Sequence, residues 1–291
     1  YSNSKNPKLA SNLLFLCSMY LKQITLTQYK NIRSKTFDFN PKINCFIGDN
    51  GKGKSNILDA IYHLAFGKSY FNPIATQNIQ LGEEFFVIEG RYERENREEK
   101  IVCNLKKGQK KVMKRNGKEY EKLTDHIGLI PTVIISPADR DLISEGSSTR
   151  RKFMDGVIGQ TDALFLKNLI EYQKILSQRN ALLKFFALNN TFEPETLAIY
   201  NIQLVQRSTA LYEKRKAFME TFIPVFNDRY HDISEGNERV DLEYESQLHE
   251  NSHQDLLENS FEKDKVLQYT STGIHKDDIN FLLETQPIKK F

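Results

Sequence analysis

The feature that most constrains this chain is a glycine-rich run at residues 48–55, whose spacing matches the phosphate-binding P-loop pattern G-x-x-x-x-G-K-[ST]. The apolar residues 43–47 predict a short buried strand before the loop, and apolar residues at helical spacing from Ile57 to Ala65 predict a helix after it. Strand, loop and helix therefore follow one another in the order that a P-loop needs. This order favours a nucleotide site over a glycine-rich turn that binds nothing.

Each part of the run has a chemical role in binding a nucleoside triphosphate. Glycines let the backbone wrap closely around phosphates, and the N-terminus of the next helix directs unpaired N–H groups and a positive dipole end toward them. Lys54 is expected to reach the β and γ phosphates of ATP, and the Ser55 hydroxyl to ligate Mg²⁺. The predicted ATP site consists of Gly48, Asp49, Asn50, Gly51, Lys52, Gly53, Lys54 and Ser55.

Composition limits the classes of protein to which the chain can belong. Its 291 residues allow one large or two modest domains, and a formal charge of +3 is too small to identify a nucleic-acid partner by itself. Three scattered cysteines, Cys17, Cys45 and Cys103, argue against a disulfide framework or a cysteine zinc site and for a reducing cytosol. Because no apolar run approaches the roughly 20 residues of a membrane helix, we expect a soluble chain.

Strand signals dominate the first half of the chain. Apolar and β-branched residues predict strands at 20–26, 85–88 and 101–105, with Asn116-Gly117 as a hairpin turn. The continuous run at 132–135 predicts a further strand that is buried on both faces. Together with the P-loop helix, these strands predict a nucleotide-binding lobe.

After Pro137 the apolar residues follow helical periods. A second seam, with a heptad repeat from Leu197 to Phe218, begins close behind the first, so the two helices are expected to form a short antiparallel hairpin. Pro194 suits the first turn of the second helix, and Pro224 is expected to kink or end it. The first seam consists of Phe165, Leu169, Tyr172, Leu176, Arg179 and Leu183.

These patterns divide the chain into four segments. Because Met19 is the first methionine, residues 1–18 are expected to be a non-native or disordered tail. Residues 19–137 are assigned to the nucleotide-binding lobe and residues 138–235 to a helical lobe. Residues 236–291 are expected to return toward the first lobe and to be incomplete at the C-terminal end.

A second candidate site is a basic segment without acidic residues between positions 106 and 118. On a hairpin it would present a dense cationic ribbon that suits the phosphate backbone of DNA. A lysine-rich hairpin that is merely solvated is an equally good interpretation. The seven basic residues are Lys106, Lys107, Lys110, Lys111, Lys114, Arg115 and Lys118.

Two adjacent arginines predict an anionic partner. The hydroxyl residues 147–149 are expected to cap a helix whose first turn carries Arg150 and Arg151. Because cations at this end oppose the helix dipole, each arginine needs a partner. An internal carboxylate such as Asp155 is favoured over a phosphate.

The sequence HENSH formally matches the H-E-x-x-H pattern of zinc proteases. That pattern needs both of its histidines, here His249 and His253, on one helical face. Asn-Ser is poor helix material, and no third ligand is evident nearby, so a chance match is favoured.

Several stretches together resemble the RecF family, which are bacterial recombination and replication repair ATPases of the ABC/SMC-like class. The stretch LTQYKN at residues 26–31 is similar to the family's opening L-x-x-F-R-N, with Tyr and Lys in place of Phe and Arg. Residues 135–155 are similar to P-x-D…G-x-x-x-R-R-x-F-L-D, and GIHKDD at 273–278 is similar to Gly-Pro-His-Arg-Asp-Asp. With the P-loop, the matches run from about residue 21 to residue 278.

The resemblance implies an α/β P-loop NTPase of the ABC/SMC type, with a mixed-sheet nucleotide lobe and a helical second lobe containing a short antiparallel helical hairpin. It implies a cytoplasmic, ATP-dependent protein of recombinational repair and replication restart that binds single- and double-stranded DNA at gaps. It further implies an ATP-dependent homodimer, RecR- and RecO-type mediators as partners in loading recombinase, and weak DNA-stimulated ATP hydrolysis.

The chain also departs from the family pattern. A signature segment and a Walker B strand, which hydrolysis needs, do not occur before Phe291, so we expect a C-terminally truncated chain with weak ATP binding at most and negligible turnover. Asp139 stands near the position of a glutamine in many relatives, and no metal role is carried over to it. The main alternative, an SMC-like structural head, is disfavoured because the heptad seam lasts only a few turns before Pro224. A zinc hydrolase at His249 and His253 is the lesser alternative.

Overall fold

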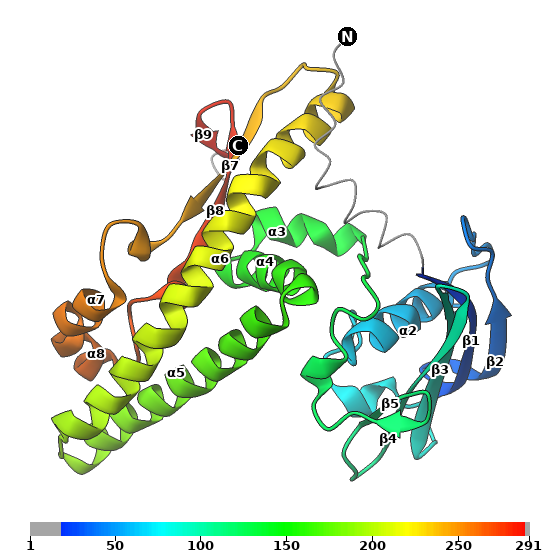
Figure 1. Cartoon of the computed structure of the whole chain (residues 1–291), viewed down its shortest axis with the longest axis horizontal. Helices are drawn as coiled ribbons and strands as arrows, with labels where there is room; N and C mark the ends of the chain where they lie inside the picture. The colour runs from blue at the N-terminus through cyan, green and yellow to red at the C-terminus, as the bar shows by residue number, and fades with distance from the viewer. Residues whose placement is uncertain (1–18, 289–291) are drawn as a thin grey trace. The chain divides into compact units, whose positions relative to one another are not determined.

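The computed structural model describes residues 19–288, which divide between two compact units, Tyr1–Ile134 and Ile135–Phe291 (Figure 1). The predicted tail at residues 1–18 and Cys17 lie outside the described residues, and the predicted domain limits stay predictions. None of the helices in residues 19–288 combines the length and the hydropathy that crossing a bilayer requires.

Unit 1 is built on a six-stranded antiparallel sheet in the order β2-β1-β3-β4-β5-β6. Alternate side chains of a strand point to one face, and on this face Phe86, Ile88 and Tyr92 of β3 are buried. They share a core with Ile57 and Leu64 of the P-loop helix α2 (Lys54–Phe66). The strands are β1 (Met19–Tyr29), β2 (Ile32–Asp38), β3 (Phe85–Arg94), β4 (Arg97–Lys106), β5 (Val112–Arg115) and β6 (Lys118–Glu119).

The local predictions for unit 1 are confirmed where turn chemistry or alternation specified them. Strands form over the predicted residues 20–26, 85–88 and 101–105. Asn116 and Gly117 join β5 to β6 with φ of 50° and 85°, the left-handed pair that a tight hairpin requires. Two single-turn 3₁₀ helices, η1 (Ala75–Asn78) and η2 (Leu123–Asp125), complete the unit.

Two predicted strands are not formed. Residues 43–47 and 132–135 pair with no strand among residues 19–288, and Ile47 and Val133 are 94% and 80% exposed. Of the first run, Phe46 is anchored, through edge contacts with the rings of Phe37 and Phe39. The prediction of a run buried on both faces is wrong, because an apolar sequence does not by itself supply the neighbouring backbone that a ladder needs.

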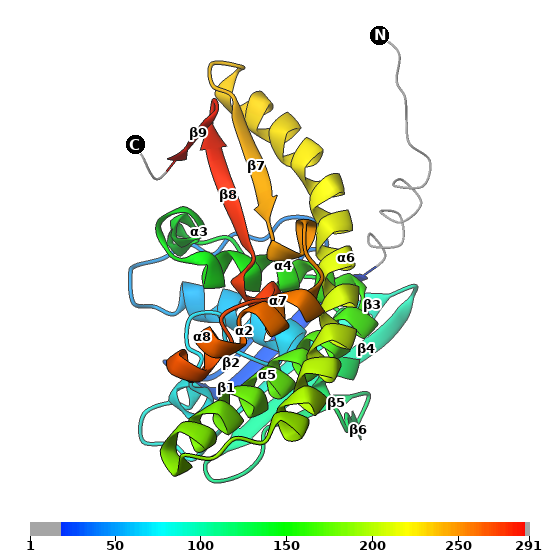
Figure 2. The ribbon, with the colours of Figure 1, turned by 90° about the vertical axis from the view of Figure 1, so that its left-hand side faces the viewer.

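Unit 2 combines a long helical hairpin with a small antiparallel sheet of order β7-β8-β9. Figures 1 and 2 both show α5 and α6 side by side, and β7 lies against α6. The helices are α3 (Asp141–Ser144), α4 (Ser147–Thr161), α5 (Ala163–Asn189), α6 (Pro194–Ser234), α7 (His253–Asn259) and α8 (Phe261–Leu267). The strands are β7 (Val240–Glu245), β8 (Asp278–Leu283) and β9 (Gln286–Pro287), and the 3₁₀ turns are η3 (Pro137–Arg140), η4 (Gln247–His249) and η5 (Ile274–Lys276).

The predicted antiparallel helical hairpin is confirmed. Pro194 begins α6, and Leu204 and Leu211 of its heptad seam are fully buried. Pro224, however, lies inside α6, which continues to Ser234, so the arm does not end at this proline, and the alternative that Pro224 kinks the helix stays a prediction. The aromatic side chains that flank it, Phe222 and Phe226, pack against the unit 2 core and offset the missing backbone hydrogen bond.

Candidate phosphate-binding site

The glycine-rich run closes into a loop that leads directly into α2. Gly48, Gly51 and Gly53 have φ of 150°, 80° and 93°, backbone conformations that glycine adopts without steric cost. The space beside Gly48 and Gly51 is open, since a Cβ there would meet no atom within 4 Å. No side chain caps α2, so the N–H groups of Lys54 and Ser55 are available to an anion, whereas the Asn56 N–H donates to the Gly53 carbonyl oxygen at 3.0 Å.

Lys54 folds back over the start of this loop. Its Nζ donates to the carbonyl oxygens of Gly48 at 2.6 Å and Asp49 at 2.8 Å. Ser55 is exposed in the first turn of α2, one residue after Lys54. The loop therefore offers an ammonium, uncapped N–H groups, a hydroxyl and open space, which together fit a polyphosphate.

The donor set also fits Mg²⁺ in the way that nucleotide sites hold it. Among residues 19–288, no cluster of three or more His, Cys, Asp or Glu residues forms a metal cage. Magnesium in nucleotide sites needs no such cage, because phosphates and water supply most of its ligands. The Ser55 hydroxyl is the group that would hold the ion from the protein side in such an arrangement.

A buried carboxylate of α2 anchors the turn between β1 and β2. Asp59 is 0% exposed and accepts hydrogen bonds from Tyr29 Oη at 2.6 Å, Ser69 Oγ at 2.7 Å and the Tyr70 N–H at 2.7 Å. Lys30 Nζ forms an ion pair with it at 2.6 Å. Burial acts to raise the pKa of Asp59, but the hydrogen bonds from Lys30, Tyr29 and Ser69 outweigh it and hold this pKa below its ordinary value. The carboxylate therefore stays ionised.

The basic segment at residues 106–118 folds as two turns joined by β5 rather than as one continuous ribbon. Three of its cations are already engaged by the protein: Lys107 by Glu84, Arg115 in a bidentate pair by Glu99, and Lys111 by the carbonyl oxygen of Gly67. Four side chains make no hydrogen bond or ion pair with residues 19–288, and these are Lys106, Lys110, Lys114 and Lys118. Contact of this segment with DNA stays a prediction.

The arginines of α4 are bound inside unit 2. Arg150 is 2% exposed and forms a bidentate pair with Asp278 at 2.6 and 2.9 Å, while Arg151 donates to the carbonyl oxygen of Asp277. The predicted internal carboxylate is present, but it is Asp278 rather than Asp155. The prediction that the hydroxyl residues 147–149 cap the helix is wrong. The helix α4 begins at the first of these residues, so Gly146 takes the N-cap position, and no side chain caps the helix.

Asp155 is instead part of a buried ion-pair cluster around Arg215. Arg215 is 2% exposed and donates to both oxygens of Asp155 at 2.9 Å and to Asp277 Oδ2 at 2.7 Å. Tyr244 Oη donates to the same Asp277 oxygen at 2.6 Å. Burial acts to lower the pKa of Arg215, but the two carboxylates raise it, so the guanidinium stays charged. No local pattern indicates this cluster, because the two carboxylates lie 60 and 62 residues from Arg215 along the chain.

Arg179 is likewise a buried arginine that is paired with a carboxylate inside unit 2. It stood in the apolar seam of the first predicted helix, and it is indeed buried in that position on α5. Its Nη1 donates to Asp264 of α8 and to Thr270 Oγ1, both at 2.8 Å. A charged residue in the seam therefore indicated a carboxylate on a neighbouring element.

The two histidines of the HENSH sequence do not form a metal site. His249 lies in η4 and His253 begins α7, so they do not share the helical face that the zinc pattern needs. His249 Nδ1 lies 3.0 Å from Tyr212 Oη, and His253 Nδ1 lies 2.6 Å from Ser208 Oγ. The zinc hydrolase alternative is wrong, because the intervening residues form a turn instead of a helix.

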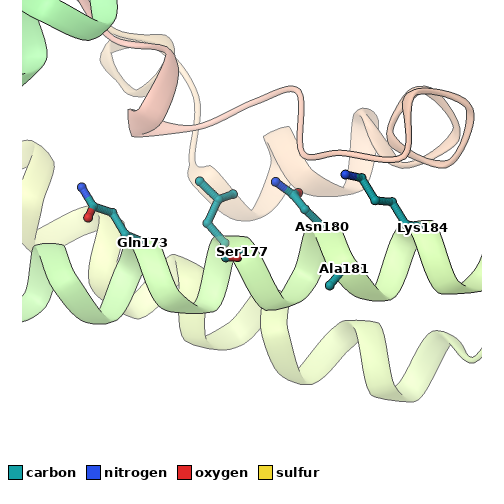
Figure 3. A pocket seen from close by; sticks show the side chains of 6 residues that line it. Gln173, Ser177, Asn180, Ala181 and Lys184 are labelled. Atoms are coloured by element: carbon teal, nitrogen blue, oxygen red, sulfur yellow. The ribbon is translucent and has the colours of Figure 1, made fainter. Parts of the chain in front are cut away.

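A shallow groove of about 480 Å³ lies along α5 in unit 2 (Figure 3). Figure 3 shows the side chains of Gln173, Asn180 and Lys184 directed toward the chain segment above the helix. Asn180 is already engaged there, since its Oδ1 accepts hydrogen bonds from Thr270. The groove offers no buried charge or nucleophile, and its remaining lining residues are Leu176, Ser177 and Ala181.

Comparison with known proteins agrees with this geometry. Residues 19–286 match a family model described as an AAA ATPase domain. A relative from Flavobacterium johnsoniae, named DNA replication and repair protein RecF, is 60% identical over 273 residues, which cover 94% of this chain and 76% of that protein. A solved structure of the recombination mediator protein RecF with ATP, described as part of the RecFOR pathway, has a TM-score of 0.87 at 29% identity, covering 94% of this chain and 76% of the other. An SMC head bound to the C-terminal winged-helix domain of ScpA, at 16% identity and a TM-score of 0.51 over 94% of this chain and 71% of that one, has the same fold.

Proposed function

This chain belongs to the RecF family of DNA replication and repair proteins, and from this premise we propose that its P-loop binds ATP and that ATP controls its binding to DNA during recombinational repair and replication restart. The observation that carries the proposal is the loop at residues 48–55, with its positive-φ glycines and Lys54 at the uncapped start of α2. This is the arrangement that cradles phosphates in nucleotide-binding proteins.

On ATP binding, Lys54 exchanges its two carbonyl partners for phosphate oxygens. The distances of 2.6 and 2.8 Å place its ammonium against the loop, where a short movement suffices for the exchange. The backbone N–H groups at the start of α2 bind further phosphate oxygens. The Ser55 hydroxyl would hold Mg²⁺, which would supply positive charge against the phosphates. Weak binding and negligible hydrolysis by residues 1–291 stay predictions, which a steady-state ATPase measurement checks.

The same family membership supports the choice of partners. The name and description of the relatives point to DNA replication, repair and the RecFOR pathway, so we assign single- and double-stranded DNA at gaps, and mediators of the RecO and RecR type, as partners. An ATP-dependent homodimer and a location in the cytoplasm, where the bacterial DNA lies, complete the proposal. An SMC-like tether is not favoured, because α5 and α6 end after 27 and 41 residues.

ATP binding is tested with the Lys54→Ala variant. Titration with a fluorescent ATP analogue should give measurable affinity for the unsubstituted chain and a loss of at least tenfold in the variant, because the variant lacks the ammonium that lies against the loop backbone. Lys42→Ala is the matched control and should keep the affinity, since Lys42 is an exposed lysine that precedes the loop and lies outside the predicted site. Equal affinity of the Lys54→Ala variant and the unsubstituted chain would contradict the proposal.

DNA binding is tested through its dependence on salt. Each phosphate that is neutralised on duplex DNA contributes about −0.9 to the slope of log K against log salt concentration. Replacing the four unengaged lysines, Lys106, Lys110, Lys114 and Lys118, with alanine should therefore make the slope less steep by up to about 3.6 units. A control variant with the same charge change replaces four exposed lysines elsewhere, namely Lys167, Lys174, Lys216 and Lys263. A slope that is equal in both variants would remove the basic segment from the DNA site.

A further inference from the structure

The turn between β1 and β2 is held rigidly next to the phosphate loop. It consists of Lys30 and Asn31, because Tyr29 pairs with Ile32 across it. Lys30 has a φ of 52°, donates its backbone N–H to Asn78 O at 2.9 Å and forms the buried ion pair with Asp59. The turn is thus fixed to both the η1 segment and α2.

From this fixed turn, the side chain of Asn31 contacts three positions of the loop and its helix. Its Nδ2 donates to the carbonyl oxygen of Gly51 at 2.8 Å, and its Oδ1 accepts from Asn56 Nδ2 at 2.8 Å. It also packs over the Cα of Gly53, where an added Cβ would lie 2.8 Å from Asn31 Oδ1. One amide therefore spans from the middle of the loop to the first turn of α2.

Holding the Gly51 carbonyl has a consequence for the donors of the loop. In a planar trans peptide the C=O and the following N–H point in opposite directions, so fixing the Gly51 carbonyl also fixes the direction of the Lys52 N–H. A carbonyl oxygen that turned toward a bound phosphate would repel it. The contact with Asn31 opposes this rotation, which the conformational freedom of Gly51, with its φ of 80°, would otherwise permit.

We infer that Asn31 is a positioning residue of the phosphate loop: through its hydrogen bonds to Gly51 and Asn56, it preorganises the backbone donors for a polyphosphate. This inference rests on the proposed binding of ATP at the same loop. Asn31 touches no phosphate itself, and its effect on affinity passes through the backbone of residues 51–56.

Hydrogen–deuterium exchange and nucleotide titration of four variants test the inference. In Asn31→Ala, loop peptides covering residues 48–56 should exchange faster without nucleotide, and the affinity for fluorescent ATP and ADP analogues should fall about three- to tenfold, the worth of one or two net hydrogen bonds. Asn31→Asp keeps the acceptor for Asn56 and loses the donor to Gly51, so it should be at least as weak. The double variant Asn31→Ala/Asn56→Ala should bind no more weakly than Asn31→Ala alone.

The matched control is Ser34→Ala, an exposed polar residue on β2 that does not contact the loop. It should leave exchange and affinity unchanged. The inference would be overturned if the loop peptides of Asn31→Ala exchanged hydrogen for deuterium at the rate of the unsubstituted chain. It would also be overturned if Asn31→Ala kept its nucleotide affinity while Lys54→Ala bound weakly. If the unsubstituted chain binds neither analogue, the proposed function is wrong, and the exchange of the loop peptides still decides the role of Asn31.

Discussion

Replacing Arg215 with alanine should destabilise unit 2 more than any exposed substitution on the same helix. The change removes four hydrogen bonds, two to Asp155, one to Asp277 and one to the carbonyl oxygen of Ile274. It also leaves Asp277, whose side chain is fully buried, without its cation. Breaking a buried ion pair by removing one partner costs about 3–5 kcal/mol, because an uncompensated charge stays buried.

Urea unfolding followed by circular dichroism at 222 nm measures this cost, because helices α5 and α6 dominate the signal. With a dependence of about 2 kcal/mol per molar urea, the midpoint of Arg215→Ala should lie about 1.5–2.5 M lower. Arg229→Ala is the matched control on α6, since Arg229 is exposed and its pair with Asp232 is exposed too, so its midpoint should not change measurably. Equal midpoints for the two variants would refute the electrostatic explanation of the buried cluster.

The pH dependence of the Arg215→Ala cost gives a second test. Burial raises the pKa of Asp277 above its ordinary value even with Arg215 present, and removing the guanidinium should raise it further. In Arg215→Ala, the free-energy cost of burying the unpaired Asp277 carboxylate is therefore full above this raised pKa. The cost shrinks as the pH falls through this pKa, because protonation removes the charge. The difference between the variant and the unsubstituted chain should therefore be smaller at pH 5 than at pH 8. A difference that grows toward pH 5 would contradict the assignment to Asp277.

Three further predictions use single residues as reporters. Burial lowers the pKa of both His253 and His275 to about 4. The stability that they contribute as neutral groups is therefore full above pH 6.5, and it should fall by about 1.4 kcal/mol per pH unit for each histidine as the pH drops toward 4. A His253→Gln variant should lose less stability than the unsubstituted chain over this pH range. Gly53→Ala should weaken binding of the ATP analogue more than tenfold, since Gly53 has a φ of 93° and an added Cβ would lie too close to the side chain of Asn31. Gly156→Ala in α4 is the control and should have no effect, because an added Cβ there meets open space. Iodoacetamide should alkylate the exposed Cys45 but not Cys103, because Cys103 is buried and burial raises its pKa to about 12. Peptide mass mapping should find Cys103 modified only after the chain unfolds. Labelling of Cys103 in the folded chain would place it outside the core.

Features that depend on neighbouring residues were predictable from the sequence. The P-loop follows from glycine and lysine at fixed offsets, and the hairpin of α5 and α6 follows from apolar residues at helical periods. The Asn116-Gly117 turn follows from the two residues that tolerate positive φ there. These signals are reliable because backbone conformation and side-chain period act within a few residues of one another.

Which strands pair in the sheets, and which carboxylate pairs with a buried arginine, depends on the tertiary structure. Residues 43–47 and 132–135 have the composition of buried strands, but whether a strand forms depends on a backbone beside it, which no local pattern specifies. Arg150 finds its carboxylate 128 residues away in Asp278, because β8 lies against α4.

The phosphate loop itself combines both kinds of information. The spacing of its glycines and lysine specifies which residues form it and where its helix begins. Only the folded chain brings Asn31, 20 residues earlier, to the carbonyl of Gly51. The physical reason is that a hydrogen bond needs a distance of about 3 Å between two atoms, and packing of whole elements, not spacing along the chain, sets that distance.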